Sequence, residues 1–190
     1  VFGGVIGPFS LAGRLLDMTG IMTALLMEPD EVHLLLEKCT SFIDHYIEKQ
    51  IDAGVYGIIM AEPAAGLLAP DQCEEFSSVY VKQLVGKYQN RHLLFMLHNC
   101  GHTESLVESM VGTGAAALHF GNAVDMGTIL PQVPSDRLVL GNLDPVNLIK
   151  AGPVEGIRRE LQVLKAYTAD YPNFIVSSGC DVPPGTPLEH

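Results

Sequence analysis

The chain has 190 residues, of which 47% are hydrophobic and only 17% are charged. This composition excludes a disordered tail and suffices for one globular domain, which we expect to extend over residues 1–190. The 22 acidic residues outnumber the 11 basic ones and give a net charge of −11. Nucleic acid and membrane surfaces are therefore not expected as partners, because nucleic acids and anionic lipids repel such a chain.

Short apolar runs alternate with helical segments along the chain. The first run, at 1–9, is predicted to be a strand that ends near Gly7, and helical material follows over 11–50. Pro29 and the two acidic residues after it predict a new helix start, since proline and acidic side chains suit a first helical turn. Further strands are predicted at 55–61, 93–97, 115–120, 138–140 and 174–177, and further helices at 70–88, 103–111, 124–130 and 146–167, the last with a break near 152–153.

The order of these elements predicts an α/β fold of about six strand–helix units. The predicted strands are continuously apolar, which is typical of a parallel sheet buried on both faces. An open doubly wound sheet and a TIM (β/α)8-type barrel both fit this pattern. No glycine-rich phosphate loop of the GxGxxG or GxxxxGK type follows the first strand, which favours the barrel.

Polar residues gather where the predicted strands end, which in such barrels is the edge that carries the chemistry. His98 and Cys100 are two residues apart at the end of an extended strand, so both side chains should point to the same side. Gly101 then allows the backbone to turn, and Cys180 closes the last predicted strand. One imidazole and two thiolates are a soft ligand set that suits zinc and leaves a fourth position open. The alternative is that these cysteines are inert packing residues.

Other candidates near the strand ends have structural alternatives as well. Glu62 follows the second strand and is a candidate fourth ligand or proton acceptor, or else a helix-capping carboxylate. Asp144 is a candidate catalytic residue, or part of a plain Asp-Pro turn. His102 is expected to cap or line the following helix, and His119, inside a strand, to be a hydrogen-bonded core histidine.

The four cysteines do not form a disulfide framework. They are placed irregularly, and Cys39 and Cys73 fall on predicted helices, where we expect them to pack in the core. This pattern indicates reduced thiols in a cytoplasmic protein.

Five segments in a fixed order resemble one known family. They are GPFSLA at 7–12, the loop from 62 to 70, HNCGH at 98–102, GNLDP at 141–145 and GCDVPPGTPLE at 179–189. Together they resemble the uroporphyrinogen decarboxylase superfamily. The HxCG element followed by the late Gly-Cys pair resembles its branch of cobamide-dependent methyltransferases, such as the methylcobamide:coenzyme M methyltransferases.

The resemblance implies a TIM barrel in which the positions of His98, Cys100 and Cys180 are Zn²⁺ ligands. It implies transfer of a methyl group from a methylated corrinoid, carried by a partner protein, to a small thiol such as coenzyme M. Decarboxylases of the superfamily lack this zinc triad. Two alternatives stay open: a uroporphyrinogen decarboxylase, and a non-catalytic module that binds a corrinoid protein.

The resemblance also implies two further strand–helix units before residue 1 and a final helix after the last segment. The chain then corresponds to the C-terminal part of a barrel. Six units cannot close an eight-stranded barrel, so we expect two open sheet edges and either an opened sheet or association with a second copy of the chain.

Overall fold

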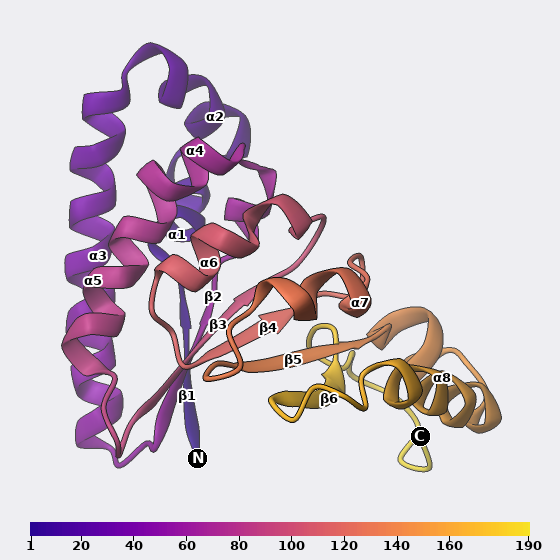
Figure 1. Ribbon diagram of the computed structural model, residues 1–190. Coiled ribbons are helices and arrows are strands. Elements are labelled where there is room, and N and C mark those ends of the chain that lie inside the picture. The colour runs from indigo at the N-terminus through magenta and orange to yellow at the C-terminus, as the bar shows by residue number, and fades with distance from the viewer.

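A computed structural model describes residues 1–190, and its centre is one six-stranded sheet (Figure 1). All neighbouring strands pair in parallel, in the order β1-β2-β3-β4-β5-β6. A doubly wound sheet would reverse its order, so this consecutive order confirms the barrel-type prediction. The strands are β1 (Phe2–Ile6), β2 (Gly57–Ala61), β3 (Leu94–Asn99), β4 (Ala117–Phe120), β5 (Leu138–Leu143) and β6 (Phe174–Ser178).

Helices connect successive strands, as the sequence predicts. The region expected to be helical over 11–50 begins earlier and consists of three helices. The break before 154 is confirmed, because it separates a π-helical turn from the last helix. The helices are α1 (Pro8–Leu16), α2 (Met18–Met27), α3 (Pro29–Asp52), η1 (Pro63–Leu67), α4 (Pro70–Cys73), η2 (Glu74–Ser78), α5 (Val79–Tyr88), η3 (Glu104–Leu106), α6 (Val107–Gly112), α7 (Met126–Ile129), η4 (Leu130–Gln132), η5 (Pro145–Lys150) and α8 (Val154–Tyr167).

Local sequence explains where the N-terminal helices divide. Asp17 has a φ of 59°, which ends α1, and its carboxylate accepts a hydrogen bond from Thr19 N at 2.7 Å, which caps α2. Pro29 opens α3 with two acidic residues in the first turn, as predicted. No single helix has the length and apolar character to span a membrane; α1 and α2 reach it only together, and they are bent by 105°.

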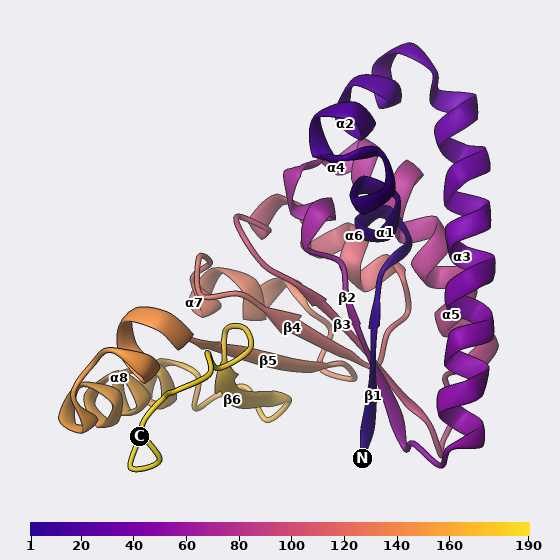
Figure 2. The same ribbon diagram turned by 180° about the vertical axis from the view of Figure 1, so that it is seen from behind.

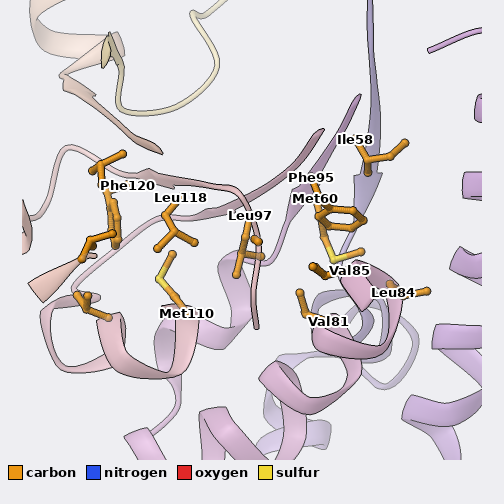
Figure 3. Packing of buried hydrophobic residues seen from close by; sticks show 14 of the residues in the cluster. Ile58, Met60, Val81, Leu84, Val85, Phe95, Leu97, Met110, Leu118 and Phe120 are labelled. Atoms are coloured by element: carbon orange, nitrogen blue, oxygen red, sulfur yellow. The ribbon is translucent and has the colours of Figure 1, made fainter. Parts of the chain in front are cut away.

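The main hydrophobic core lies between one face of the sheet and the helices. Figure 3 shows Ile58, Met60, Phe95 and Leu97 of the strands directed toward side chains of α5 and α6. These helices and α3 lie along the same side of the strands in both views (Figures 1 and 2). Packing on this face therefore fixes which alternate residues of each strand point to the other face.

The opposite face of the sheet is not covered by helices, so the prediction that the strands are buried on both faces is wrong for this chain. Ile59, Met96 and Leu140 are only half-buried on this face, although His98 is buried there, and no residue of β6 is fully buried. β1 pairs only with β2, and β6 only with β5, which confirms the two open edges. Association with a second copy stays a prediction. One row in register crosses the uncovered face: Ile6, Ala61, His98, His119, Leu140 and Ile175.

Candidate functional site

The carboxyl ends of β3, β4 and β6 approach one another through two glycines. A β-carbon at Gly121, just after β4, would lie 2.9 Å from Cys100 Cα. A β-carbon at Gly179, just after β6, would lie 2.5 Å from the backbone nitrogen of Asn122. Real β-carbons do not approach so closely, so only glycine permits these contacts. The loops after β3, β4 and β6 are thereby brought together at one edge of the sheet.

His98 is the next-to-last residue of β3, and it lies on the uncovered face. Its Nδ1 is 3.3 Å from the carbonyl oxygen of His119. Because a carbonyl can only accept, Nδ1 carries the hydrogen and Nε2 of the neutral ring keeps its lone pair. That lone-pair nitrogen lies 3.8 Å from Cys180 Sγ. The structure therefore brings together two of the three predicted zinc ligands, from strands far apart in the sequence.

The protonation states of the site follow from its burial. Burial, and to a smaller extent the neighbouring His119, lowers the pKa of His98 to about 4. The imidazole is therefore neutral at pH 7. Burial raises the pKa of the Cys100 thiol, and the nearby Cys180 also raises it. In the metal-free chain Cys100 is thus protonated at neutral pH, and it ionises only when a cation offsets the charge.

The side chains of His98, Cys100 and Cys180 are chemically suited to a zinc ion, and the distance from His98 Nε2 to Cys180 Sγ also fits one. Sulfur and nitrogen ligands at ordinary zinc bond lengths in a tetrahedral arrangement are about 3.6 Å apart, close to the 3.8 Å between His98 and Cys180. A ligating histidine usually donates its other N–H to a carbonyl or carboxylate, as His98 does. No three His, Cys, Asp or Glu side chains are gathered closely enough to hold a metal ion. The triad that includes Cys100 stays a prediction.

A cavity of about 510 Å³ opens beside Cys100, which is half-buried. Arg14 and Met18 line it from the N-terminal helices, and His102 lies on its border. The predicted capping role of His102 is not seen, because Thr103 precedes the first turn of η3 and the His102 side chain is exposed. The cavity is large enough for a small organic ligand.

Glu62 lies just after β2 and is 1% exposed. Its Oε1 accepts hydrogen bonds from Phe9 N at 2.7 Å, Ser10 N at 3.1 Å and Ser77 Oγ at 3.3 Å. Phe9 and Ser10 are in the first turn of α1, so Glu62 caps that helix from another part of the chain. Burial raises the pKa of Glu62 to about 7, against the lowering effect of these hydrogen bonds. These contacts agree with the alternative that Glu62 caps a helix, and a catalytic role for Glu62 stays a prediction.

Asp144 is half-buried and stands immediately before the π-helical turn η5. Its carboxylate accepts hydrogen bonds from the backbone nitrogens of Val146 and Asn147, each at 2.8 Å. These contacts match the structural alternative of an Asp-Pro turn, and a catalytic role stays a prediction. Cys39 and Cys73 are buried, as expected, in a smaller hydrophobic cluster that also contains Phe9, Leu36 and Phe76.

His119 is the residue whose place the sequence interpretation missed. It is hydrogen-bonded as expected, through Nε2 to the carbonyl oxygen of Ser178 at 2.7 Å. Its ring also lies against that of His98, with centroids 4.6 Å apart. One signal was present in the sequence: His98 directly follows the predicted strand at 93–97, and His119 is the next-to-last residue of the next predicted strand, at 115–120. Pairing the two strand ends would have placed them side by side.

Comparison with known proteins gives the family of this chain. The family model for uroporphyrinogen decarboxylase (URO-D) matches residues 1–190. The chain is 28% identical over 189 residues to the methylcobamide:CoM methyltransferase MtbA of Methanosarcina mazei, covering 98% of the chain and 54% of the relative. It is 32% identical over 200 residues to the chloroplastic uroporphyrinogen decarboxylase of Zea mays, covering 100% of the chain and 49% of the relative. The chain thus spans about half the length of the curated relatives it matches.

A solved structure of a methyltransferase from Methanosarcina mazei superimposes on the chain with a TM-score of 0.88. The two are 22% identical, and the match covers 99% of this chain and 55% of the other. This likeness supports the barrel-type α/β fold. The chain belongs to the uroporphyrinogen decarboxylase family.

Proposed function

We propose that the protein is a zinc-dependent methyltransferase that moves a methyl group from a methylated corrinoid to a small thiol. The observation that carries the proposal is the pair formed by His98 and Cys180. A neutral imidazole directs its lone pair at a thiol 3.8 Å away, at the carboxyl edge of a parallel sheet. Similarity to the methylcobamide:CoM methyltransferases of two Methanosarcina species supports the same reaction.

His98, Cys100 and Cys180 would hold the zinc ion. When bound, zinc supplies the positive charge that ionises a substrate thiol near neutral pH, so that its sulfur becomes a nucleophile. The three ligand residues differ in whether they release a proton when zinc binds. His98 binds as the neutral ring and releases none, whereas Cys100 and Cys180 each lose their thiol proton.

The cavity beside Cys100 is the proposed place for the thiol substrate. Coenzyme M is the acceptor we propose, because a thiol of that size fits a cavity of about 510 Å³. In the reaction the carbon–cobalt bond of the methyl-corrinoid breaks and a carbon–sulfur bond forms, which leaves Co(I) with the electron pair. The corrinoid would be carried by a partner protein, and it acts as a co-substrate.

A second candidate is decarboxylation of a tetrapyrrole with acidic side chains. It is favoured by the uroporphyrinogen decarboxylases that match the chain at similar identity, including that of Synechococcus sp. (strain CC9605) at 30% over 200 residues, covering 100% of the chain and 55% of the relative. That reaction gives no role to the pair of His98 and Cys180. Loss of function on replacing either residue therefore discriminates between the two.

The direct test is an absorbance assay with free methylcobalamin, coenzyme M and the zinc-loaded protein. We expect methylcobalamin to be demethylated and a thioether to form, and both to be lost in Cys180→Ala. Cys39→Ala is the matched control, because Cys39 is a buried core cysteine that is not a predicted zinc ligand. Decarboxylation of uroporphyrinogen without any thiol methylation would contradict the proposal. Binding of a corrinoid protein with neither reaction would indicate a non-catalytic module.

A further inference from the structure

The segment that carries Cys180 is weakly supported by the sheet. β6 is an edge strand whose residues are all at least partly exposed, and residues 179–190 form no helix or strand. The sheet's last backbone contact before Cys180 is the hydrogen bond from Gly179 N to Leu143 O at 2.7 Å. Edge segments with few buried contacts open readily. Besides the close approach of Gly179 to Asn122, a side-chain contact to this segment would help to keep Cys180 beside His98.

The side chain of His119 supplies such a restraint. It starts from β4, passes over β5 and reaches β6, where Nε2 is 2.7 Å from the carbonyl oxygen of Ser178. The carbonyl can only accept, so His119 carries its hydrogen on Nε2. This contact links two strands that are not neighbours in the sheet. It holds the chain two residues before Cys180.

The backbone of the same residue orients His98. The carbonyl oxygen of His119 accepts the Nδ1 hydrogen of His98, which turns the Nε2 lone pair toward Cys180. The two rings are also in contact, with an interplanar angle of 38°. His119 therefore touches both partners: His98 through its carbonyl and ring, and the Cys180 segment through its side chain.

We infer that His119 is a positioning residue that sets the distance between His98 Nε2 and Cys180 Sγ. Its Nε2 is engaged with Ser178, and it is not one of the three proposed zinc ligands. Its effect on zinc affinity rests on the proposed function, whereas its effect on the position of Cys180 does not. The experiment below separates these two consequences.

The test compares His119→Phe, which keeps a ring but removes the donor, with His119→Gln, whose amide places a donor near the former Nε2. The exposed His92 gives the control His92→Phe. In the metal-free protein, alkylation of each cysteine by iodoacetamide is followed by mass spectrometry. We expect the rate at Cys180 to rise about five-fold in His119→Phe, the size expected for the loss of one hydrogen bond. The rate should be near the parent value in His119→Gln and in the control.

The effect of His119 on zinc affinity is measured with Zn²⁺ alone, by competition with a chromophoric chelator. We expect His119→Phe to weaken zinc binding by roughly 10- to 100-fold, the usual effect of removing a residue that orients a ligand. His119→Gln should restore most of the affinity. If the parent protein binds no zinc while the alkylation result holds, the proposed function fails and the positioning role stands.

Unchanged alkylation at Cys180 in a folded His119→Phe protein would overturn the inference. If that variant does not fold, as judged by circular dichroism, ¹⁵N NMR of the parent decides. We expect His119 to carry its hydrogen on Nε2 and His98 on Nδ1. The opposite tautomer of His119 would overturn the inference as well.

Discussion

The imidazole of His98 and the thiol of Cys180 lie 3.8 Å apart, although 82 positions separate them in the chain. One comes from an inner strand of the sheet and the other from the segment after the edge strand β6. Their meeting depends on the close approach of the loops at Gly121 and Gly179 and on the neutral tautomer of His98.

Zinc affinity should depend steeply on pH. His98 has its pKa lowered to about 4 by burial, so it does not compete for protons between pH 6 and 8. The thiols do compete, and burial raises the pKa of Cys100 above its ordinary value. Release of two thiol protons predicts roughly a 100-fold gain in affinity for each pH unit in this range. Chelator competition at pH 6, 7 and 8 measures it, and an affinity that does not change would exclude thiolate ligation.

Replacement of Gly179 by alanine should disrupt the site. The added β-carbon would lie 2.5 Å from Asn122 N, which is a backbone atom and cannot move without displacing the loop after β4. We expect weaker zinc binding and lower thermal stability. Gly86→Ala is the matched control, because nothing lies within 4 Å of the added atom on α5; there we expect unchanged zinc affinity and a gain of about 0.4–1 kcal/mol. Equal zinc affinity in the two variants would argue against the contact.

Glu62 should make the stability of the fold depend on pH. Its pKa is raised from 4.5 to about 7, mainly by burial, so the folded state favours the protonated carboxyl. The stabilisation from this proton is complete below about pH 4.5 and is lost as the pH rises to about 7. The change amounts to about 3 kcal/mol at most.

Glu62→Gln tests this dependence and the proposed catalytic role together. Glutamine can keep the acceptor oxygen that faces Phe9 and Ser10, and it does not titrate. In this variant the free energy of unfolding, measured with urea from pH 5 to 8, should no longer contain the contribution that decreases as the pH rises. If methyl transfer is unchanged in this variant, Glu62 only caps the helix. If the pH dependence of stability is the same as in the parent, the folded state does not favour the protonated carboxyl of Glu62.

Asp144→Ala should lower stability without changing metal content. The carboxylate caps η5 through two backbone N–H groups, and its loss should cost about 1 kcal/mol. Thermal unfolding measures the loss, and elemental analysis should give the same zinc per chain as the parent. A loss of methyl transfer with normal stability would instead assign Asp144 to the reaction.

Most of the fold was predictable from the sequence because apolar runs and turn residues mark each strand–helix unit. Local rules also located the start of α3 at Pro29 and the break before α8. The burial of the strands was not predictable in this way. Continuous apolar strands suggest that both faces of the sheet are buried. Whether the second face is buried depends on how the sheet closes, and no local sequence pattern specifies that.

The site was only partly predictable for a similar reason. The HxC spacing places His98 and Cys100 on one side of a strand, which is a local rule. Cys180 was grouped with them because it closes the last predicted strand, and the family resemblance supported that set. The contact of His119 with Ser178 passes over β5 and depends on register. The capping of α1 by Glu62 joins residues more than 50 positions apart. Such contacts follow from the tertiary arrangement and carry no signature in the neighbouring sequence.

The measurement that tests the central claim most directly is zinc per chain in the purified protein, compared with Cys100→Ser, Cys180→Ala and the control Cys39→Ala. The account predicts one zinc per chain in the parent and in the control, and a large loss in each of the other two variants. Cys100→Ser is the most informative, because the structure brings His98 and Cys180 together while the part of Cys100 rests on prediction. Full zinc occupancy in Cys180→Ala, or a parent protein that binds no zinc, would contradict the account.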